Sequence, residues 1–186
     1  MRKIYLSILF IIFTITITAQ EPEKTFVPYY IVDGQISEFE KAGAKIEAKS
    51  IGFGYGGVNS YYTIFKSKNS TVQFKSTEIP KFIIKTDANT ETFELVIVTK
   101  ADVVKKKKTY RRFVIRGNAI GGAKDFSDIK FTPTLKKISD NLYEIVFNKP
   151  LVPGEYSFSP IYKGLQAGNI MTSTGKTILY CFGVID

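Results

Sequence analysis

Apolar and polar residues alternate along most of this chain, and the pattern is clearest in segments 143–147 and 178–184. Alternation with a period of two places successive side chains on opposite faces of a β-strand, whereas an amphipathic helix needs a period of about 3.6. The same alternation in segments 44–48 and 109–116 predicts two further strands. In the latter, Phe113 and Ile115 are expected on one face, with Arg112 and Arg116 on the other.

Turn-forming residues separate these runs. Asp33-Gly34 is a strong hairpin signal, and segments 67–70, 139–141 and 150–154 are rich in Ser, Asn, Asp, Pro or Gly. Only segment 37–44 is compatible with a helix, and Gly43 would keep it short. The pattern predicts an all-β fold, a single-domain antiparallel β-sandwich of about ten strands, with a closed β-barrel as the alternative.

The first 19 residues have the composition of a secretory signal peptide. Arg2 and Lys3 precede an apolar run that ends near Thr18, and Ala19 is a small residue at the expected cleavage point. We therefore expect residues 1–19 to be removed, after Ala19 or Gln20, and residues 20–186 to form the β-sandwich domain. The predicted location is the periplasm or the extracellular space.

Three residue types are scarce, and their scarcity limits the chemistry. The chain has no His, no Trp and a single Cys, Cys181. Without His it lacks the commonest general base and the commonest transition-metal ligand, and Cys–His zinc sites are excluded. One Cys cannot form an internal disulfide, so packing must stabilise the fold. Cys181 itself is interpreted as a buried, small apolar residue.

The chain is basic, with a formal net charge of +9, and its positive charge is concentrated in one segment. That segment contains seven cationic residues, which are Lys105, Lys106, Lys107, Lys108, Arg111, Arg112 and Arg116. We interpret it either as a solvated strand end or as a site for an anionic surface of the cell envelope. Nucleic acid is a less favoured partner, because few aromatic residues are interleaved with the basic ones.

Tyrosines gather in two parts of the N-terminal half. Tyr55, Tyr61 and Tyr62 are candidates for a ligand-binding surface, since Tyr is favoured at interfaces. Tyr on a strand of period two is also a common half-buried core residue. Both interpretations stay open at the level of sequence.

Two motif matches do not carry their usual chemistry. Segment 52–57 fits GxGxxG, but the residues after it favour a strand and not the helix that a dinucleotide site requires. The Ser-x-x-Lys spacing occurs at Ser127–Lys130 and at Ser173–Lys176, in segments without a helical pattern and without the companion motifs of acyl enzymes. We predict no cofactor, no metal and no catalytic residue.

The segment Leu151-Val152-Pro153-Gly154-Glu155-Tyr156, followed by the C-terminal Cys181-Phe182-Gly183, resembles uncharacterised exported proteins of Gram-negative bacteria. That resemblance implies a β-sandwich of immunoglobulin-like type and an exported location. It brings no catalytic residues.

Three functions are consistent with these observations. The leading hypothesis is a non-enzymatic interaction or structural module of the cell envelope, with another envelope protein or an anionic surface as partner. The second is a protein that binds a small ligand or a glycan. The third is a hydrolase of envelope polymers that works through Ser, Lys or paired carboxylates.

Overall fold

The computed structural model describes residues 21–50, 57–65, 67–88, 96–105, 109–119, 122–123, 126–160 and 177–186. These residues form strands and no helix, and no segment among them is a helix long and apolar enough to cross a membrane. The all-β prediction is confirmed. Segment 37–44, the one place where a helix was considered, lies in strands. Residues 1–20, with the predicted signal peptide, fall outside the described ranges.

The described residues contain more strands than the predicted ten, because several are only two or three residues long. In chain order they are β1 Pro28–Val32, β2 Gln35–Glu38, β3 Glu40–Ser50, β4 Val58–Phe65, β5 Gln73–Lys75, β6 Lys81–Lys85, β7 Val96–Lys100, β8 Asp102–Lys105, β9 Thr109–Ala119, β10 Gly122–Ala123, β11 Lys130–Phe131, β12 Thr134–Ser139, β13 Leu142–Val146, β14 Gly154–Pro160 and β15 Thr177–Ile185.

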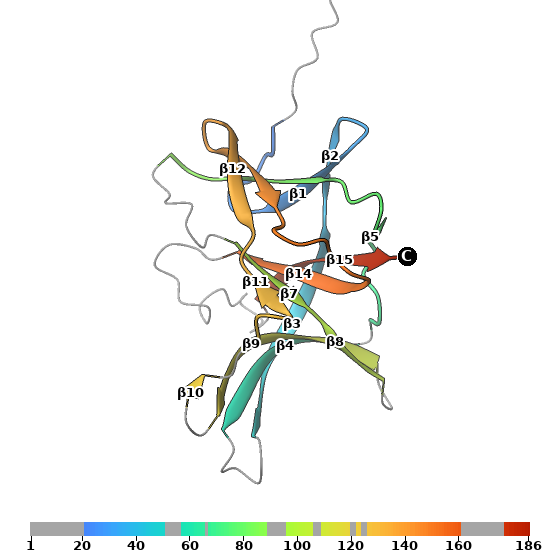
Figure 1. Cartoon of the computed structure of the whole chain (residues 1–186), viewed down its shortest axis with the longest axis vertical. Coiled ribbons are helices and arrows are strands. Elements are labelled where there is room, and N and C mark those ends of the chain that lie inside the picture. Colours follow the sequence, from blue (N-terminus) through green and yellow to red (C-terminus); the bar gives the residue numbers. More distant parts are fainter. Residues whose placement is uncertain are drawn as a thin grey trace, which may run out of the picture.

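The strands form two sheets. The smaller sheet has the order β12-β13-β6-β1-β2, and the larger has the order β10-β9-β4-β3-β15-β14-β7-β11, with β5 beside β15 and β8 beside β9. The pairings are antiparallel except that between β5 and β15. Figure 1 shows the smaller sheet at the top, β7, β14 and β15 in the middle, and the long strands β3, β4 and β9 below.

The larger sheet curls into a nearly closed barrel. The sheet closes on itself through the continuous run of β7 and β8, which are separated only by Ala101. Strand β7 pairs with β14 and β8 pairs with β9, so this run joins the two sides of the sheet. The Ala101 amide donates to the Glu155 carbonyl at 2.7 Å and keeps the junction attached to β14. The fold is therefore consistent with either predicted architecture, the β-sandwich or the barrel.

An aromatic core fills the space between the two sheets. It is built from twelve buried residues, which are Phe39, Phe74, Phe82, Ile84, Val96, Val98, Ile145, Leu151, Tyr156, Phe158, Phe182 and Val184. Phe82 and Phe182 meet with ring centroids 5.2 Å apart. Phe39 lies between β2 and β3, where the chain passes from the smaller sheet to the larger. Its ring contacts Phe82 of the smaller sheet and Phe182 of the larger one.

A second core lies inside the barrel and has smaller side chains. It contains Ala42, Ala44, Tyr62, Ile64, Phe113, Leu179 and Cys181. Strand β15 contributes to both cores, because Cys181 points into the barrel and Phe182 points toward the smaller sheet. The alternation in segment 178–184 is thus correct, although both faces of this strand are buried.

The predicted hairpin turns are confirmed where residues adopt left-handed backbone conformations. Asp33 and Gly34 have φ angles of 51° and 76° and connect β1 to β2. Asn141 has a φ angle of 62° in the turn between β12 and β13. Asn, Asp and Gly tolerate this region better than other residues do, so the turn signals in the sequence have a direct structural cause.

Candidate ligand-binding site

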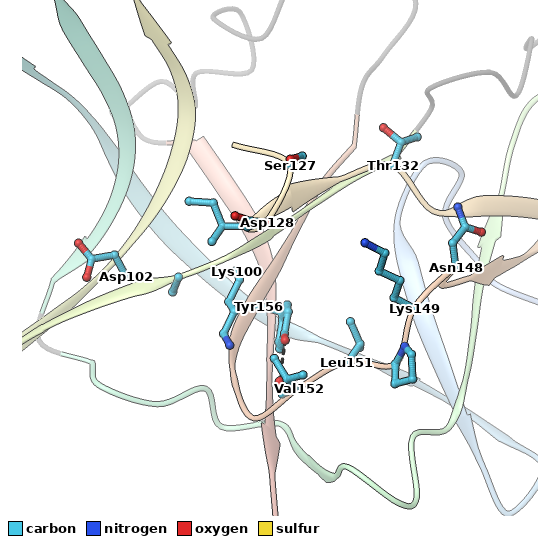
Figure 2. Close-up of a pocket in the computed structure, with 13 residues that line it drawn as sticks. Lys100, Asp102, Ser127, Asp128, Thr132, Asn148, Lys149, Leu151, Val152 and Tyr156 are labelled. Carbon is cyan, nitrogen blue, oxygen red and sulfur yellow. Dashed lines mark hydrogen bonds between the residues drawn. The ribbon is translucent and has the colours of Figure 1, made fainter. Parts of the chain in front are cut away.

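A pocket of about 560 Å³ opens beside the junction of β7 and β8. Figure 2 shows its walls, formed by the β7–β8 junction, by segment 126–132 and by the turn at 148–152. The described residues that line it are Lys100, Ala101, Asp102, Ser127, Asp128, Ile129, Thr132, Asn148, Lys149, Pro150, Leu151, Val152 and Tyr156.

Backbone hydrogen bonds hold segment 126–132 against β7. The Lys100 amide donates to the Ile129 carbonyl at 2.6 Å, and β11 pairs with β7 immediately afterwards. The Phe126 carbonyl accepts from the amides of Ile129 and Lys130 at 2.9 and 2.7 Å. This single turn places Ser127 and Asp128 on the pocket wall. The wall therefore depends on main-chain geometry more than on the identity of its side chains.

Tyr156 anchors one side of the pocket. Its hydroxyl donates to the Val152 carbonyl at 2.6 Å, and its ring stacks on Phe182 with centroids 5.4 Å apart. Burial raises the pKa of the Tyr156 hydroxyl, although the hydrogen bond to Val152 opposes this, so the group stays a neutral donor. The Lys100 ammonium lies 6.0 Å from the centroid of the same ring.

The charges in the pocket are unequally compensated. Asp102 is paired with Arg112, on the outer side of the barrel wall. Across the residues that the structure describes, Lys100 and Lys149 have no ion-pair partner, and neither has Asp128. In Figure 2 the Lys149 ammonium points into the open space between segment 126–132 and the turn at 148–152. Two lysines against one unpaired carboxylate leave the pocket with an excess of positive charge.

A second hollow, of about 550 Å³, lies on the other side of the same turn. It shares Asn148, Lys149, Pro150 and Leu151 with the pocket. Its other described lining residues are Ser76, Ile79, Pro80, Lys81, Phe82, Glu144, Ile145, Val146 and Phe147. We call this hollow the apolar groove, because aliphatic and aromatic side chains form most of it. Two of its charged residues, Lys81 and Glu144, pair with each other at 3.4 Å, and the third is the shared Lys149.

Of the tyrosines proposed as a ligand surface, Tyr61 and Tyr62 do not line either hollow. Tyr62 is buried in the barrel core, where burial raises the pKa of its hydroxyl. Tyr61 lies on the outer face of β4, where its hydroxyl accepts a hydrogen bond from the side-chain Nδ2 of Asn59 at 2.9 Å. Tyr55 lies outside the described residues. The core interpretation is correct for Tyr62, and the position of Tyr61 leaves it available at the surface.

Arg111 requires a correction, because it cannot belong to an exposed basic patch. Its side chain is completely buried inside the barrel. Both terminal nitrogens bind Glu40, at 3.1 and 2.8 Å, and one also lies 3.3 Å from Glu155. The same cluster fixes the segment after β4, since the Ser70 amide donates to Glu155 at 2.6 Å. Arg111 is therefore a structural cation.

Arg112, the next residue, lies on the opposite face of β9. It pairs with Asp102, and its guanidinium lies 4.9 Å from the Tyr61 ring centroid and 5.8 Å from that of Tyr110. These contacts explain why only 14% of its side chain is exposed. The side chains of Lys105 and Arg116, and Lys106, Lys107 and Lys108 altogether, lie outside the described part of the structure.

Two features of the sequence touch the pocket, the serine motif at Ser127 and the segment Leu151–Tyr156. Ser127 lines it, but Lys130 does not, and the Lys130 ammonium donates to the Ile115 carbonyl at 2.7 Å. Neither feature predicts that these residues meet at one site, since they come from segments far apart in the chain. Ser173–Lys176 lies outside the described residues.

In the described ranges, no three His, Cys, Asp or Glu side chains are grouped as metal ligands. Comparison with known proteins adds no assignment: no protein-family model, no curated protein and no solved structure matches the chain.

Proposed function

We propose that this protein is an exported, non-enzymatic module that binds a small ligand in the pocket beside Tyr156. The observation that carries the proposal is a hollow of about 560 Å³ with an apolar side at Leu151, Val152 and Tyr156 and unpaired charges at Lys100 and Lys149. Small-molecule sites typically combine an apolar wall of this kind with a few converging polar groups, in volumes of about 300–1,000 Å³.

Two observations argue against catalysis by a Ser–Lys pair at Ser127 or by Cys181. A Ser–Lys mechanism needs the lysine amine beside the serine hydroxyl, but the ammonium of Lys130 is engaged by the Ile115 carbonyl. Cys181 is fully buried, and burial raises the pKa of its thiol to about 12. A thiol with such a pKa stays protonated near neutral pH and is a poor nucleophile. Binding is therefore the function that the pocket supports best.

The export part of the proposal rests on segment 1–19 and on the resemblance to exported β-sandwich proteins. Its test is the mass of the mature protein recovered from the cell envelope or the medium. Loss of residues 1–19 or 1–20 is the expected result, and a full-length cytoplasmic product would contradict it.

The binding proposal is tested by ligand-observed NMR with a library of small polar and amphiphilic compounds. We expect a set of compounds that bind the natural protein and lose binding in Thr132→Trp, because Thr132 is an exposed residue on the pocket wall. The control is Lys68→Trp, at an exposed position that lines neither hollow. Binding that is absent, or that survives in Thr132→Trp, would contradict the proposal.

A further inference from the structure

The pocket and the apolar groove adjoin each other across one turn. Asn148, Lys149, Pro150 and Leu151 form a wall of both hollows. One molecule lying across this turn would contact both. The two sides differ in chemistry, since the unpaired lysines Lys100 and Lys149 line the pocket and hydrophobic side chains dominate the groove.

The groove is suited to a flexible apolar chain. Its floor is formed by Phe82 and Ile145, which belong to the aromatic core and are almost completely buried. Phe147 meets Phe82 edge-to-face, with ring centroids 5.6 Å apart. Val146, which is 36% exposed, forms part of its outer side. Because Lys81 and Glu144 neutralise each other, the remaining charge on the groove is that of Lys149, at the turn that it shares with the pocket.

The pocket is suited to an anionic head group. Lys149 belongs to both linings and is therefore placed where a head group would join its chain. The Lys100 ammonium lies near the Tyr156 ring, on the β7 side of the pocket. Asp102 does not oppose an anion strongly, because Arg112 pairs with it. The carboxylate of Asp128 balances one of the two lysine charges. The pocket keeps one unbalanced positive charge, which a monoanion would neutralise.

We propose that the two hollows form one site for an amphiphilic anion, with its head group at Lys100 and Lys149 and its apolar chain in the groove. The inference rests on the proposed small-ligand function and names the class of ligand. A carboxylate and a phosphate head share the required chemistry, and both are compared in the experiment.

The experiment is isothermal titration calorimetry with hexanoate, octanoate and decanoate, decyl phosphate, decanol and decyltrimethylammonium, each below its micellar concentration. We expect affinity to rise roughly fourfold for each added CH₂ group while the chain fills the groove. Decyltrimethylammonium should not bind. Equal affinity along the series from hexanoate to decanoate, or decyltrimethylammonium binding as tightly as decanoate, would overturn the inference. The relative affinities of decanoate and decyl phosphate identify the preferred head group.

Two variants separate the head from the chain. Lys149→Gln should weaken decanoate about tenfold and leave decanol unchanged, because a charge-assisted contact is lost. Val146→Asp should weaken both ligands, since a carboxylate enters the groove. Lys68→Gln should change neither, and thermal unfolding of each variant checks that it folds. Equal weakening of decanol and decanoate by Lys149→Gln would contradict the role given to this lysine.

The two proposals fail in different ways. If other compounds bind in a manner sensitive to Thr132→Trp while none of the amphiphilic anions binds, the small-ligand function stands and the amphiphile inference is wrong. If no compound binds in that manner, both are wrong.

Discussion

The two faces of β15 border cores of different chemistry. On the side of the smaller sheet, Phe182 packs among aromatic rings, with Phe158 at 5.3 Å and Tyr156 at 5.4 Å between centroids. On the barrel side, Cys181 lies in a core with fewer aromatic rings, near the buried Arg111 with its two carboxylates. The first core depends on volume and tolerates apolar exchange. The second depends on specific partners, because an isolated buried charge is costly.

The charged cluster gives one of the two largest expected effects. Arg111→Ala would leave Glu40 and Glu155 close together without their cation, and we expect a loss of about 3–5 kcal/mol in the free energy of unfolding. The adjacent residue offers a matched control. Arg112→Ala removes a partly solvated pair and two ring contacts, so about 1 kcal/mol is expected. Urea unfolding of both variants measures the difference, and equal losses would contradict the contrast between the two faces.

The aromatic core is tested at Phe182, which is completely buried. Phe182→Ala should cost about 3–5 kcal/mol, because transfer free energy and ring contacts are lost and a cavity remains. Cys181→Ala, its neighbour on the barrel side, should cost about 1 kcal/mol, since little volume is removed. The comparison fails if Phe182→Leu, which keeps most of the apolar volume, is as unstable as Phe182→Ala.

Gly183 tests the packing at the place where β15 meets the charged cluster of Arg111, Glu40 and Glu155. A Cβ atom there would overlap the carboxamide of Gln73, which binds the Ser70 carbonyl at 2.8 Å and Glu155 at 3.2 Å. We expect Gly183→Ala to cost about 1–3 kcal/mol through overpacking. Adding Gln73→Gly should recover part of that loss. Thermal unfolding of the single and double variants measures the recovery, and no recovery would mean that the strain lies elsewhere.

The free energy of unfolding should depend on pH through two groups on the barrel side, Glu40 at acid pH and Cys181 at alkaline pH. Burial acts to raise the pKa of Glu40, but hydrogen bonds from Arg111 and the Thr71 amide outweigh it and lower the pKa. The unfolded carboxyl titrates near about 4.3, so the stability that Glu40 contributes is present above this pH and is lost as the pH falls further.

At alkaline pH the thiol of Cys181 acts in the opposite direction. Its pKa is raised to about 12 by burial, against about 8.5 in an unfolded chain. Its contribution is therefore complete below about pH 8.5 and is lost as the pH rises toward 12. Urea midpoints from pH 3 to 10 test both limbs. Glu40→Gln should flatten the acid limb and Cys181→Ala the alkaline one, and unchanged slopes would contradict these assignments.

The sequence predicts on which face of a strand a side chain lies, but it does not predict which residues from other strands that side chain contacts. Alternation placed Phe113 and Ile115 on one face of β9, and the same parity assigns Arg111 to that face. The alternation therefore predicts that Arg111 is buried. Its partners Glu40 and Glu155 come from strands distant in the chain, and no local pattern predicts them. The turn at Asp33-Gly34 was predictable because it depends on two adjacent residues.

The pocket was not predictable for the same reason. Its walls meet only because β7 continues into β8 and segment 126–132 docks through main-chain hydrogen bonds. Main-chain contacts of this kind leave no residue preference that a single sequence shows. Ser127 was noticed for a spacing to Lys130 that the structure does not use, since Lys130 binds the Ile115 carbonyl.

The most direct test of the binding site is a ¹H–¹⁵N NMR titration of the protein with decanoate. We predict that the largest amide shifts occur at Lys100, Ala101, Lys149 and Leu151 in the pocket, with further shifts at Val146 in the groove. The outer face of β4 around Asn59 and Tyr61, which line neither hollow, should not respond. Shifts confined to that outer face, or no shifts at saturating decanoate, would contradict the account.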